Sequence, residues 1–237
     1  MNPQPEWITV GALADGFAED NHILPAVDDL AGRRLSLHFD NHWQIEHHFA
    51  AHTLRWNNVG EAAGAELPYR ATCLRPGIYL VDFLKHEQGQ IHSVSLVLDL
   101  EQQCFSAVIG QMPSQAESSV DLFSRALAGG ELTSVKAQFL HGAIDTPVTA
   151  STPRHEPTDE LVGLRNRYIY SASEAYEHIY LNANFYSWQC LRGVEQGLAD
   201  TDRCHYYKIA EQLYLFVWRE KICLLYTSPS PRDKRQS

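Results

Sequence analysis

The feature that most constrains this chain is an internal repeat. The segment "LAGRRLSLHFDNHWQIEHHF" from Leu30 and the segment "LVGLRNRYIYSASEAYEHIY" from Leu161 align without a gap at an offset of 131 residues. The match continues downstream at offsets of 133 and then 135 residues, a drift typical of short loop insertions. We infer a duplication whose units are long enough to be domains. The residues shared by the two segments are Leu30 and Leu161, Gly32 and Gly163, Arg34 and Arg165, Glu46 and Glu177, and His47 and His178.

The end of the chain needs a separate interpretation. The segment "CLLYTSPSPRD" from Cys223 to Asp233 back-translates in frame into a transposase-type sequencing adaptor. We therefore interpret residues 223–237 as an adaptor artefact and leave them out of the fold argument. The alternative is a genuine Ser/Pro-rich basic tail.

Strand patterns dominate both copies. Aromatic and β-branched residues recur in short runs, and Gly, Asn and Pro separate these runs. Evenly spaced short strands without helical periodicity between them indicate antiparallel meanders that close as barrels or sandwiches. The runs are 33–39, 53–59 and 77–84 in the first copy, and 167–171, 185–191 and 212–220 in the second.

The first copy continues into a hairpin that has no counterpart in the second. Val94, Leu96 and Leu98 alternate with other residues, and the polar turn "EQQ" then precedes the apolar run "CFSAVIG". This pattern predicts two paired strands within Gly89–Met112. We therefore expect the second barrel to lack its last hairpin.

The resulting fold prediction is all-β, with two tandem antiparallel barrels, the second truncated and open, and one short helix between them. The expected helix has Ser118 or Ser119 as its N-cap and stops at Gly129 and Gly130. The expected divisions are an N-terminal lead at 1–29, the first barrel at 30–113, the helix with a Pro/Thr-rich linker at 114–160, the second barrel at 161–222, and the artefact at 223–237.

Composition argues against several classes of protein. The net charge is −10, and Lys and Arg are not clustered, so nucleic acid is not an expected partner. No apolar run approaches the roughly 20 residues of a membrane span, and the start lacks the pattern of a secretory signal. We expect a cytoplasmic protein with no membrane partner. Without a C-x-x-C pair, the cysteines outside the adaptor segment favour reduced, buried thiols over a metal or redox site; they are Cys73, Cys104, Cys190 and Cys204.

Several longer motifs point to a family. The segments "FDNHWQIEHHF", "LPYRATCLRPGIYLVDF", "SVSLVLDL" and "YEHIYLNANFYSWQCLRGVEQGLAD" resemble MoaF, the molybdenum cofactor biosynthesis protein F family, across the chain up to Ile222. The resemblance implies two lipocalin-like barrels, one per repeat. It also associates the chain with molybdenum cofactor or aromatic-amine metabolism, although neither a fold nor a family name establishes an activity.

Each copy more distantly resembles the small barrel of phenolic acid decarboxylases. If the chain is an enzyme, this resemblance implies catalytic roles for Tyr168, Tyr170 and Glu220. Two phenols would hold a substrate carboxylate or phenolate, and a buried Glu would move a proton. The arginine of that family falls near Leu198, and the closest arginine in this sequence is Arg203.

The first copy departs further from the decarboxylase pattern, because Leu37, Phe39 and Lys85 stand where Tyr, Tyr and Glu are expected. Strand parity then predicts which side chains line each barrel, since alternate residues share a face. Such an aromatic lining suits a planar, partly polar small molecule, aromatic or pterin-like. The expected ligand-binding residues are Tyr176, His178, Tyr180 and Trp218 in the second copy and His47, Phe39 and Tyr79 in the first.

The remaining polar residues have structural interpretations. His47 and His48 face opposite sides of a strand, so we expect no metal site in the cluster His38, His42, His47, His48 and His52. No cofactor is expected. Glu46 and Glu177 have the parity opposite to the pocket residues, and we expect them to pair with Arg34 and Arg165 outside the barrels.

Two functional hypotheses stay open. The first is a non-enzymatic carrier or sensor whose pockets bind the small molecule. The second is a cofactor-free acid-base lyase or isomerase that works through the Tyr and Glu residues of the second barrel. The missing arginine and the divergence of the first copy favour the carrier. The sequence predicts neither the ligand's identity nor an oligomeric state.

Overall fold

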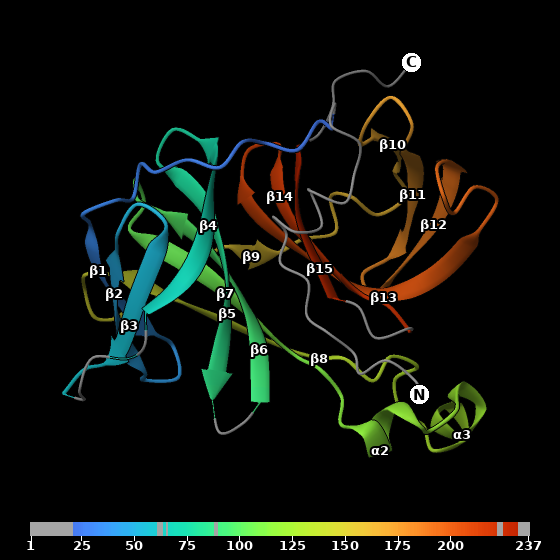
Figure 1. The fold of residues 1–237 in the computed structure, drawn as a ribbon, viewed down its shortest axis with the longest axis horizontal. Coiled ribbons are helices and arrows are strands. Elements are labelled where there is room, and N and C mark those ends of the chain that lie inside the picture. The colour runs from blue at the N-terminus through green and yellow to red at the C-terminus, as the bar shows by residue number, and fades with distance from the viewer. Residues whose placement is uncertain (1–20, 61–63, 65, 88–89, 222–224, 232–237) are drawn as a thin grey trace. The chain divides into compact units, whose positions relative to one another are not determined.

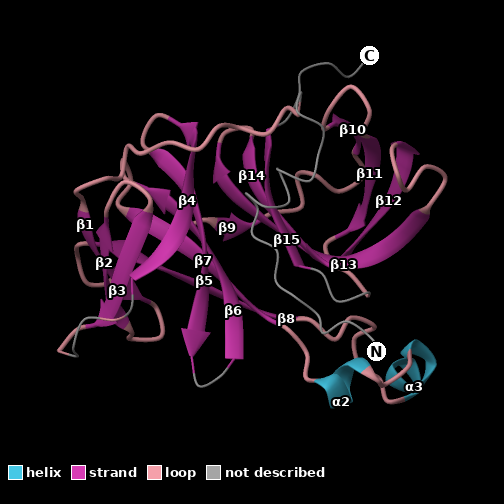
Figure 2. Ribbon diagram, viewed as in Figure 1, coloured by secondary structure: helices cyan, strands magenta, loops and turns pink. Residues whose placement is uncertain are grey.

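The computed structural model describes residues 21–60, 64, 66–87, 90–221 and 225–231, and it shows an all-β chain with two antiparallel sheets (Figures 1 and 2). The expected fold class is confirmed. The first compact unit comprises Leu24–Gln111 and Ala137–His155. The second unit comprises Met112–Lys136, Glu156–Ser237 and the chain before Leu24, as far as these residues are described.

The first unit contains a closed barrel of eight strands in the order β1 to β8. Each strand is antiparallel to its neighbours, and β8 pairs with β1 to close the ring (Figure 1). The strands are β1 (Arg34–Phe39), β2 (Gln44–Phe49), β3 (Thr53–Asn58), β4 (Glu66–Arg75), β5 (Ile78–Glu87), β6 (Gln90–Asp99), β7 (Cys104–Gln111) and β8 (Lys136–Ile144).

Alternate positions of these strands fill the interior of the first barrel. Leu37, Leu96 and Leu98 are at most 1% exposed and belong to one hydrophobic cluster with Phe105 and Ala107. Strand residues two apart point to the same face, so the alternation that predicts β6 and β7 also delivers their side chains to the core. The predicted hairpin is confirmed, with Asp99 opposite Cys104 at its turn.

The eighth strand comes from outside the range 30–113 expected for the first barrel. Residues 136–144 were expected to belong to the helix-and-linker region, but they form β8, and Phe39 of β1 pairs with Gly142 of β8. Pairing between segments about a hundred residues apart leaves no local signature in a sequence. The first barrel therefore needs a strand that its own repeat does not contain.

The second unit contains an open sheet with the path β10-β11-β12-β13-β14-β15, and β9 pairs with β13 beside that path. The strands are β9 (Glu156–Pro157), β10 (Arg165–Ile169), β11 (Ala175–Asn182), β12 (Phe185–Arg192), β13 (Ala199–Ala210), β14 (Leu213–Arg219) and β15 (Leu225–Pro231). β15 lies within the adaptor-like segment and pairs with β14. Its Leu, Tyr and Thr residues favour an extended strand wherever a free edge is available.

The duplication is visible in the hydrogen bonds of the two copies. Gly32 N–H donates to Phe49 O at 2.8 Å, and Gly163 N–H donates to Tyr180 O at 2.8 Å. Both glycines adopt the left-handed conformation, with φ of 80° and 84°, which a residue with a side chain adopts only at a cost. The same turn thus introduces the first hairpin of each sheet.

Strand register extends this correspondence along both copies. His47 pairs with Trp56 in the first sheet, and His178 pairs with Trp188 in the second. Further along, Ala71 pairs with Val81, and Tyr206 pairs with Phe216 at the offset of 135 residues. The repeat read from the sequence is therefore a repeat of structure.

Two short helices, α2 (Gln115–Ser118) and α3 (Leu122–Leu127), follow β7 and precede β8 in the described part of the chain, where one helix between the two barrels was expected. The N-cap of α3 is Asp121, which accepts a hydrogen bond from Ser124 N–H, so the expected cap at Ser118 or Ser119 is wrong. Asp is as good an N-cap as Ser, and the sequence offered both. The expected stop is confirmed, since Gly129 has φ 69° and follows the C-cap residue Ala128.

Two further expectations concern the cysteines and the membrane. Cys104, Cys190 and Cys204 are free and buried, and Cys73 is free and half-buried, as the sequence predicted. Neither described helix has the length or apolarity required to cross a lipid bilayer.

Closure of the first barrel predicts an intolerant position in β8. A Cβ atom at Gly142 would overlap the carbonyl oxygen of His38 and lie 2.6 Å from the ring of Phe105. We expect Gly142→Ala to lower the free energy of unfolding by about 1–3 kcal/mol, as overpacking of a dense core does. Gly130→Ala is the control, because its nearest neighbour would be 3.5 Å away. Equal urea denaturation midpoints for the two variants would contradict the close crossing of β8 and β1.

Candidate functional site

The aromatic residues expected in the second copy gather on one face of its sheet. The rings of Tyr168 and His178 are 4.6 Å apart between centroids, and those of Tyr168 and Tyr170 are 6.2 Å apart. The ring of Trp218 lies 5.7 Å from that of His178. Strand parity therefore correctly predicts that β10, β11 and β14 present these side chains to a common region. We call this region the aromatic face.

The aromatic face has a buried floor and a partly exposed rim. His178, Tyr186 and Trp218 form the floor, with 5%, 1% and 8% of their surfaces exposed. The half-buried residues of the rim are Tyr168, Tyr170, Tyr176, Trp188 and Glu220. Polar groups at the rim remain accessible while apolar ring surface lies beneath them, an arrangement typical of small-molecule sites.

Deeper in the sheet the rings pack against one another. The ring of Phe216 contacts those of Tyr180, Tyr186 and Tyr206 at centroid distances of 4.9–5.4 Å. Tyr180 is fully buried, and its hydroxyl hydrogen bonds with that of Tyr168 at 2.7 Å. Tyr180 is therefore part of the core and orients Tyr168, whereas the sequence predicted direct contact with a ligand.

His178 is the most unusual polar group of the floor. Burial lowers the pKa of its imidazole to about 3, so the ring is neutral at physiological pH. Its Nδ1 atom is buried and has no hydrogen-bond partner among the described residues. An unsatisfied polar atom in a protein interior costs about 1–3 kcal/mol, so Nδ1 is a position where a bound molecule would gain a hydrogen bond.

Glu220 lies at the edge of the same face. Burial raises the pKa of its carboxyl group to about 7, the indole N–H of Trp218 opposes this shift through a 3.2 Å hydrogen bond, and the charges of Asp202 and Glu195 add to it. Asp202 also has a raised pKa, again mainly because of burial, and it accepts a 2.9 Å hydrogen bond from the indole of Trp188. Two indoles thus hold two carboxyl groups beside the rings.

The topology of the sheet places these groups at one end. In an antiparallel meander, successive turns alternate between the two ends of the strands. The β10–β11 turn, the β12–β13 turn and the end of β14 therefore share one end, which includes Tyr170, Tyr176 and Glu220. Tyr176 donates a 2.9 Å hydrogen bond to Glu195 of the β12–β13 turn. All three of these residues are half-buried, and we call this end the mouth of the aromatic face.

The arginine expected near the site has other partners. Arg203 donates to Glu131 at 3.0 Å and to the carbonyl oxygen of Asn184 at 3.1 Å, and its guanidinium lies over the ring of Phe185. Leu198, at the position of the decarboxylase arginine, is 57% exposed. Neither residue brings a positive charge to the aromatic face.

The first barrel presents the same positions with different chemistry. Strand register aligns the residues of the second site with apolar or basic residues of the first. Only the histidine and the first tryptophan persist, as His47 and Trp56. The aligned residues are Leu37 for Tyr168, Phe39 for Tyr170, Leu54 for Tyr186, Leu67 for Asp202, Phe83 for Trp218 and Lys85 for Glu220.

The expected ligand contacts of the first barrel lie inside its packed interior. Phe39, His47 and Tyr79 are 5%, 3% and 8% exposed, and Phe39 packs edge-on against Phe105 at 4.7 Å. Burial lowers the pKa of His47 to about 4, but its Nδ1 is 3.3 Å from the carbonyl oxygen of Ile45 and is satisfied there. The role expected for these three residues stays a prediction.

Lys85 shows how the first copy has changed. Its ammonium group lies 4.6 Å from the ring centroid of Trp56, a cation–π pair at the place where the second copy holds an acid beside indoles. The charge at this end of the two copies is therefore opposite in sign.

Outside the faces, one of the two expected ion pairs forms. Arg165 Nε lies 2.6 Å from Glu177 Oε1, as predicted. In the first copy Glu46 pairs with His48 at 3.3 Å, so the expected pair with Arg34 is replaced by a contact within β2.

The sequence interpretation missed three residues of the face, namely Tyr186, Trp188 and Asp202. Their positions follow from the pairing of β11 with β12 and of β12 with β13. The alternation in "FYSWQCL" places Tyr186 and Trp188 on one face of a strand, which was a usable signal. Asp202 required the register of β13, which no local pattern supplies.

Comparison with known families and proteins agrees with this two-part organisation. Residues 5–114 match the MoaF N-terminal domain, and residues 155–227 match the MoaF C-terminal domain. This chain belongs to the MoaF family. The Protein MoaF of Klebsiella aerogenes is 43% identical over 226 residues, which are 94% of this chain and 81% of that relative. The two matched domains contain the two copies, so the polar aromatic face belongs to the C-terminal MoaF domain.

Glu220 predicts a pH dependence of stability. Its pKa of about 7 in the folded state exceeds the ordinary value of 4.5, so the folded chain keeps a proton that the unfolded chain loses. The contribution of this proton to the free energy of unfolding therefore falls as the pH rises from 4.5 to 7. We expect the free energy of unfolding of the wild type, measured in urea and taken relative to that of Glu220→Gln, to decrease between pH 4.5 and 7 and to stay constant above pH 7. A difference independent of pH would mean that Glu220 titrates normally.

Proposed function

We propose that this chain binds a small planar aromatic molecule with N–H donors, and that it does so on the aromatic face of the second unit. Tyr and Trp rings supply flat apolar surfaces against which a planar ring stacks. The carboxylate of Glu220, which is half-buried, accepts N–H bonds at the mouth. A protonated amine also gains from the electron-rich faces of the surrounding rings.

The observation that most supports this proposal is the buried, unsatisfied Nδ1 atom of His178. In the first barrel the corresponding Nδ1 atom of His47 is satisfied by a backbone carbonyl oxygen. The same fold thus provides a hydrogen-bond acceptor for the histidine of the first copy and, among the described residues, none for the histidine of the second copy. The second histidine lies on the same face as the tyrosine and tryptophan rings and Glu220, whose carboxyl group has a raised pKa. A ligand that hydrogen bonds to His178 removes the cost of the open atom.

The charges at the mouth favour a donor-rich ligand over an anionic one. Glu195 and Glu220 are acidic, Arg203 is engaged by Glu131, and the ammonium group of Lys221 is engaged by Asp200. An aromatic carboxylate would meet like charge there. An aryl-alkyl amine, or the amino-pyrimidinone edge of a pterin, instead presents N–H groups that a carboxylate accepts in pairs.

This ligand class agrees with the association that the family resemblance implies. Pterin-type molecules belong to molybdenum cofactor metabolism, and aryl-alkyl amines belong to aromatic-amine metabolism. We propose a carrier or sensor role in one of these settings, in the cytoplasm, where the free thiols of the chain stay reduced.

Binding can be measured by quenching of tryptophan fluorescence, because Trp188 and Trp218 border the site. We expect saturable quenching by phenylethylamine or by a pterin, and little quenching by hydroxycinnamate. Affinity for the amine should rise as the pH rises through about 7, because Glu220 must ionise to accept the charged donor. Glu220→Gln should weaken binding about tenfold or more, the loss expected for a charge-assisted hydrogen bond.

The matched control is Lys85→Gln, at the aligned position of the first barrel. It should leave the binding constant unchanged. If Lys85→Gln weakens binding as much as Glu220→Gln does, the ligand does not occupy the second unit. If neither phenylethylamine nor the pterin quenches the fluorescence, the proposed ligand class is wrong.

A second candidate function is acid-base catalysis by the same face. A carboxyl group with a pKa of about 7 can both give and take a proton near neutral pH, which favours a lyase or isomerase without a cofactor. In that case Tyr168 and Tyr170 would hold the substrate's polar group, and Glu220 would transfer the proton.

Turnover assays separate the carrier from the enzyme. With hydroxycinnamates and related aromatics, a carrier forms no product, whereas an enzyme shows a pH–rate profile with an inflection near 7. Tyr170→Phe and Glu220→Gln should each lower any turnover at least about a hundredfold, the usual contribution of one acid-base group. Turnover that survives both substitutions would exclude this mechanism.

A further inference from the structure

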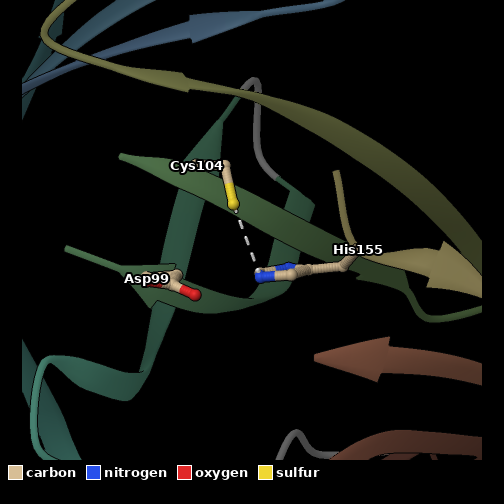
Figure 3. A group of neighbouring side chains, drawn as sticks. All are labelled: Asp99, Cys104 and His155. Atoms are coloured by element: carbon tan, nitrogen blue, oxygen red, sulfur yellow. Dashed lines mark hydrogen bonds between the residues drawn. The ribbon is translucent and has the colours of Figure 1, made fainter. Parts of the chain in front are cut away.

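A second group of chemically active side chains lies in the first unit, away from the barrel interior. Asp99, Cys104 and His155 come from the β6–β7 hairpin and from the segment after β8. They are 1%, 1% and 2% exposed, and one ligand atom from each lies within 4.8 Å of the others. Figure 3 shows the carboxylate, the thiol and the imidazole edge directed toward one another.

The hairpin itself brings the first two residues together. Asp99 and Cys104 are directly opposite in the register of β6 and β7, so their side chains share a face. Asp99 Oδ1 accepts the backbone N–H groups of Glu101 and Gln102 at 3.0 and 2.8 Å. These bonds fix the carboxylate at the turn and leave lone pairs of Oδ2 available, since Oδ2 accepts one bond, from the Gln102 side chain.

The third residue is oriented by a hydroxyl group. Ser106 Oγ lies 2.8 Å from Nδ1 of His155 and 2.8 Å from Nδ1 of His141. A hydroxyl donates only one hydrogen bond, so at least one of these imidazoles must donate to it. When His155 donates through Nδ1, its Nε2 lone pair faces Cys104 Sγ, 3.7 Å away. Metal-binding histidines typically have this second bond to an oxygen acceptor.

The geometry matches a small metal ion better than a reactive thiol. Sulfur and nitrogen ligands of one tetrahedral zinc ion are roughly 3.5 Å apart, close to the separation of Cys104 and His155. A nucleophilic or redox-active cysteine needs access to its substrate, and Cys104 is 1% exposed.

We propose that Asp99, Cys104 and His155 bind one zinc ion, with a fourth position left for water. The donors are a thiolate, an imidazole and a carboxylate, the set that zinc combines in proteins. The thiol proton leaves to solvent when the Zn–S bond forms. Ser106 is a positioning residue that holds the tautomer of His155.

Such a site would tie the long segment after β8 to the barrel. His155 is the last residue of the first unit, and Glu156 begins β9 of the second. A metal bond at residue 155 therefore fixes the point at which the chain leaves the first barrel. His155 is 51 residues after Cys104 in the sequence, which is why the cysteine spacing alone gave no sign of this site.

Cobalt(II) tests the proposal, because a Co–thiolate bond gives a near-ultraviolet charge-transfer band. The full chain is stripped with a chelator and titrated with cobalt, and zinc is then added. We expect a band that saturates at one cobalt per chain and is bleached by zinc. Cys104→Ala should abolish the band, and Cys73→Ala, which removes a half-buried thiol of the same unit, should leave it unchanged.

Ser106→Ala provides a variant that removes no ligand. It should weaken zinc binding about 10–100-fold, as loss of a supporting hydrogen bond does, while one metal per chain still binds at saturation. Zinc should also raise the Tm of the wild type and not that of Cys104→Ala, because a ligand of the folded state alone stabilises it. Absence of the thiolate band in the folded wild type, or its survival in Cys104→Ala, would overturn the proposal.

Discussion

Cross-strand register, set at a left-handed glycine turn, is the constraint on which the rest of this structure depends. Gly32 and Gly163 each bond to the strand that returns beside them, and this bond fixes how the first hairpin of each copy pairs. A shift of one residue would exchange the two faces of every following strand. Because the register of the first hairpin is the same in both copies, His47 and His178 occupy the same place. The copies then differ in loop length, in barrel closure and in the side chains of the shared face.

The two copies use that common scaffold in different ways. The first copy closes into a barrel with β8, and apolar residues such as Leu37 and Leu54 fill its interior. Close packing of this kind is normal for a protein core. The second sheet is open and keeps a buried histidine, phenols and two carboxyl groups with raised pKa values on the corresponding face. Buried polar groups lower stability unless they are paired, so their concentration in one copy points to function there.

The sequence predicts local features well and long-range ones poorly. Strand runs, the β6–β7 hairpin and the shared face of Tyr168, Tyr170 and His178 all follow from alternation within single strands. The strand β8 could not be predicted, because its partner β1 lies about a hundred residues earlier and pairing leaves no local pattern. Asp202 was missed for the same reason, since only the pairing of β12 with β13 places it beside Tyr186.

Shape also limits what residue types alone predict. Alternation along the strands places Tyr180 and Trp218 on the same face as the site. Tyr180 nevertheless belongs to the core, because its ring packs closely against that of Phe216. The group Asp99, Cys104 and His155 combines a hairpin register with a distant segment, and spacing rules for cysteine pairs do not describe it. Tertiary packing therefore decides which members of a correctly predicted face remain available to a ligand.

The central claim concerns one buried atom, Nδ1 of His178, which has no hydrogen-bond partner among the described residues. The corresponding Nδ1 atom of His47 in the first copy has one. Nitrogen-15 NMR of the histidine rings during titration with phenylethylamine or a pterin tests it most directly, because each ring reports on its own hydrogen bonds. The account predicts a saturable shift of the His178 Nδ1 resonance and an unchanged His47 resonance. A ligand that shifts His47, or that binds without moving His178, would contradict it.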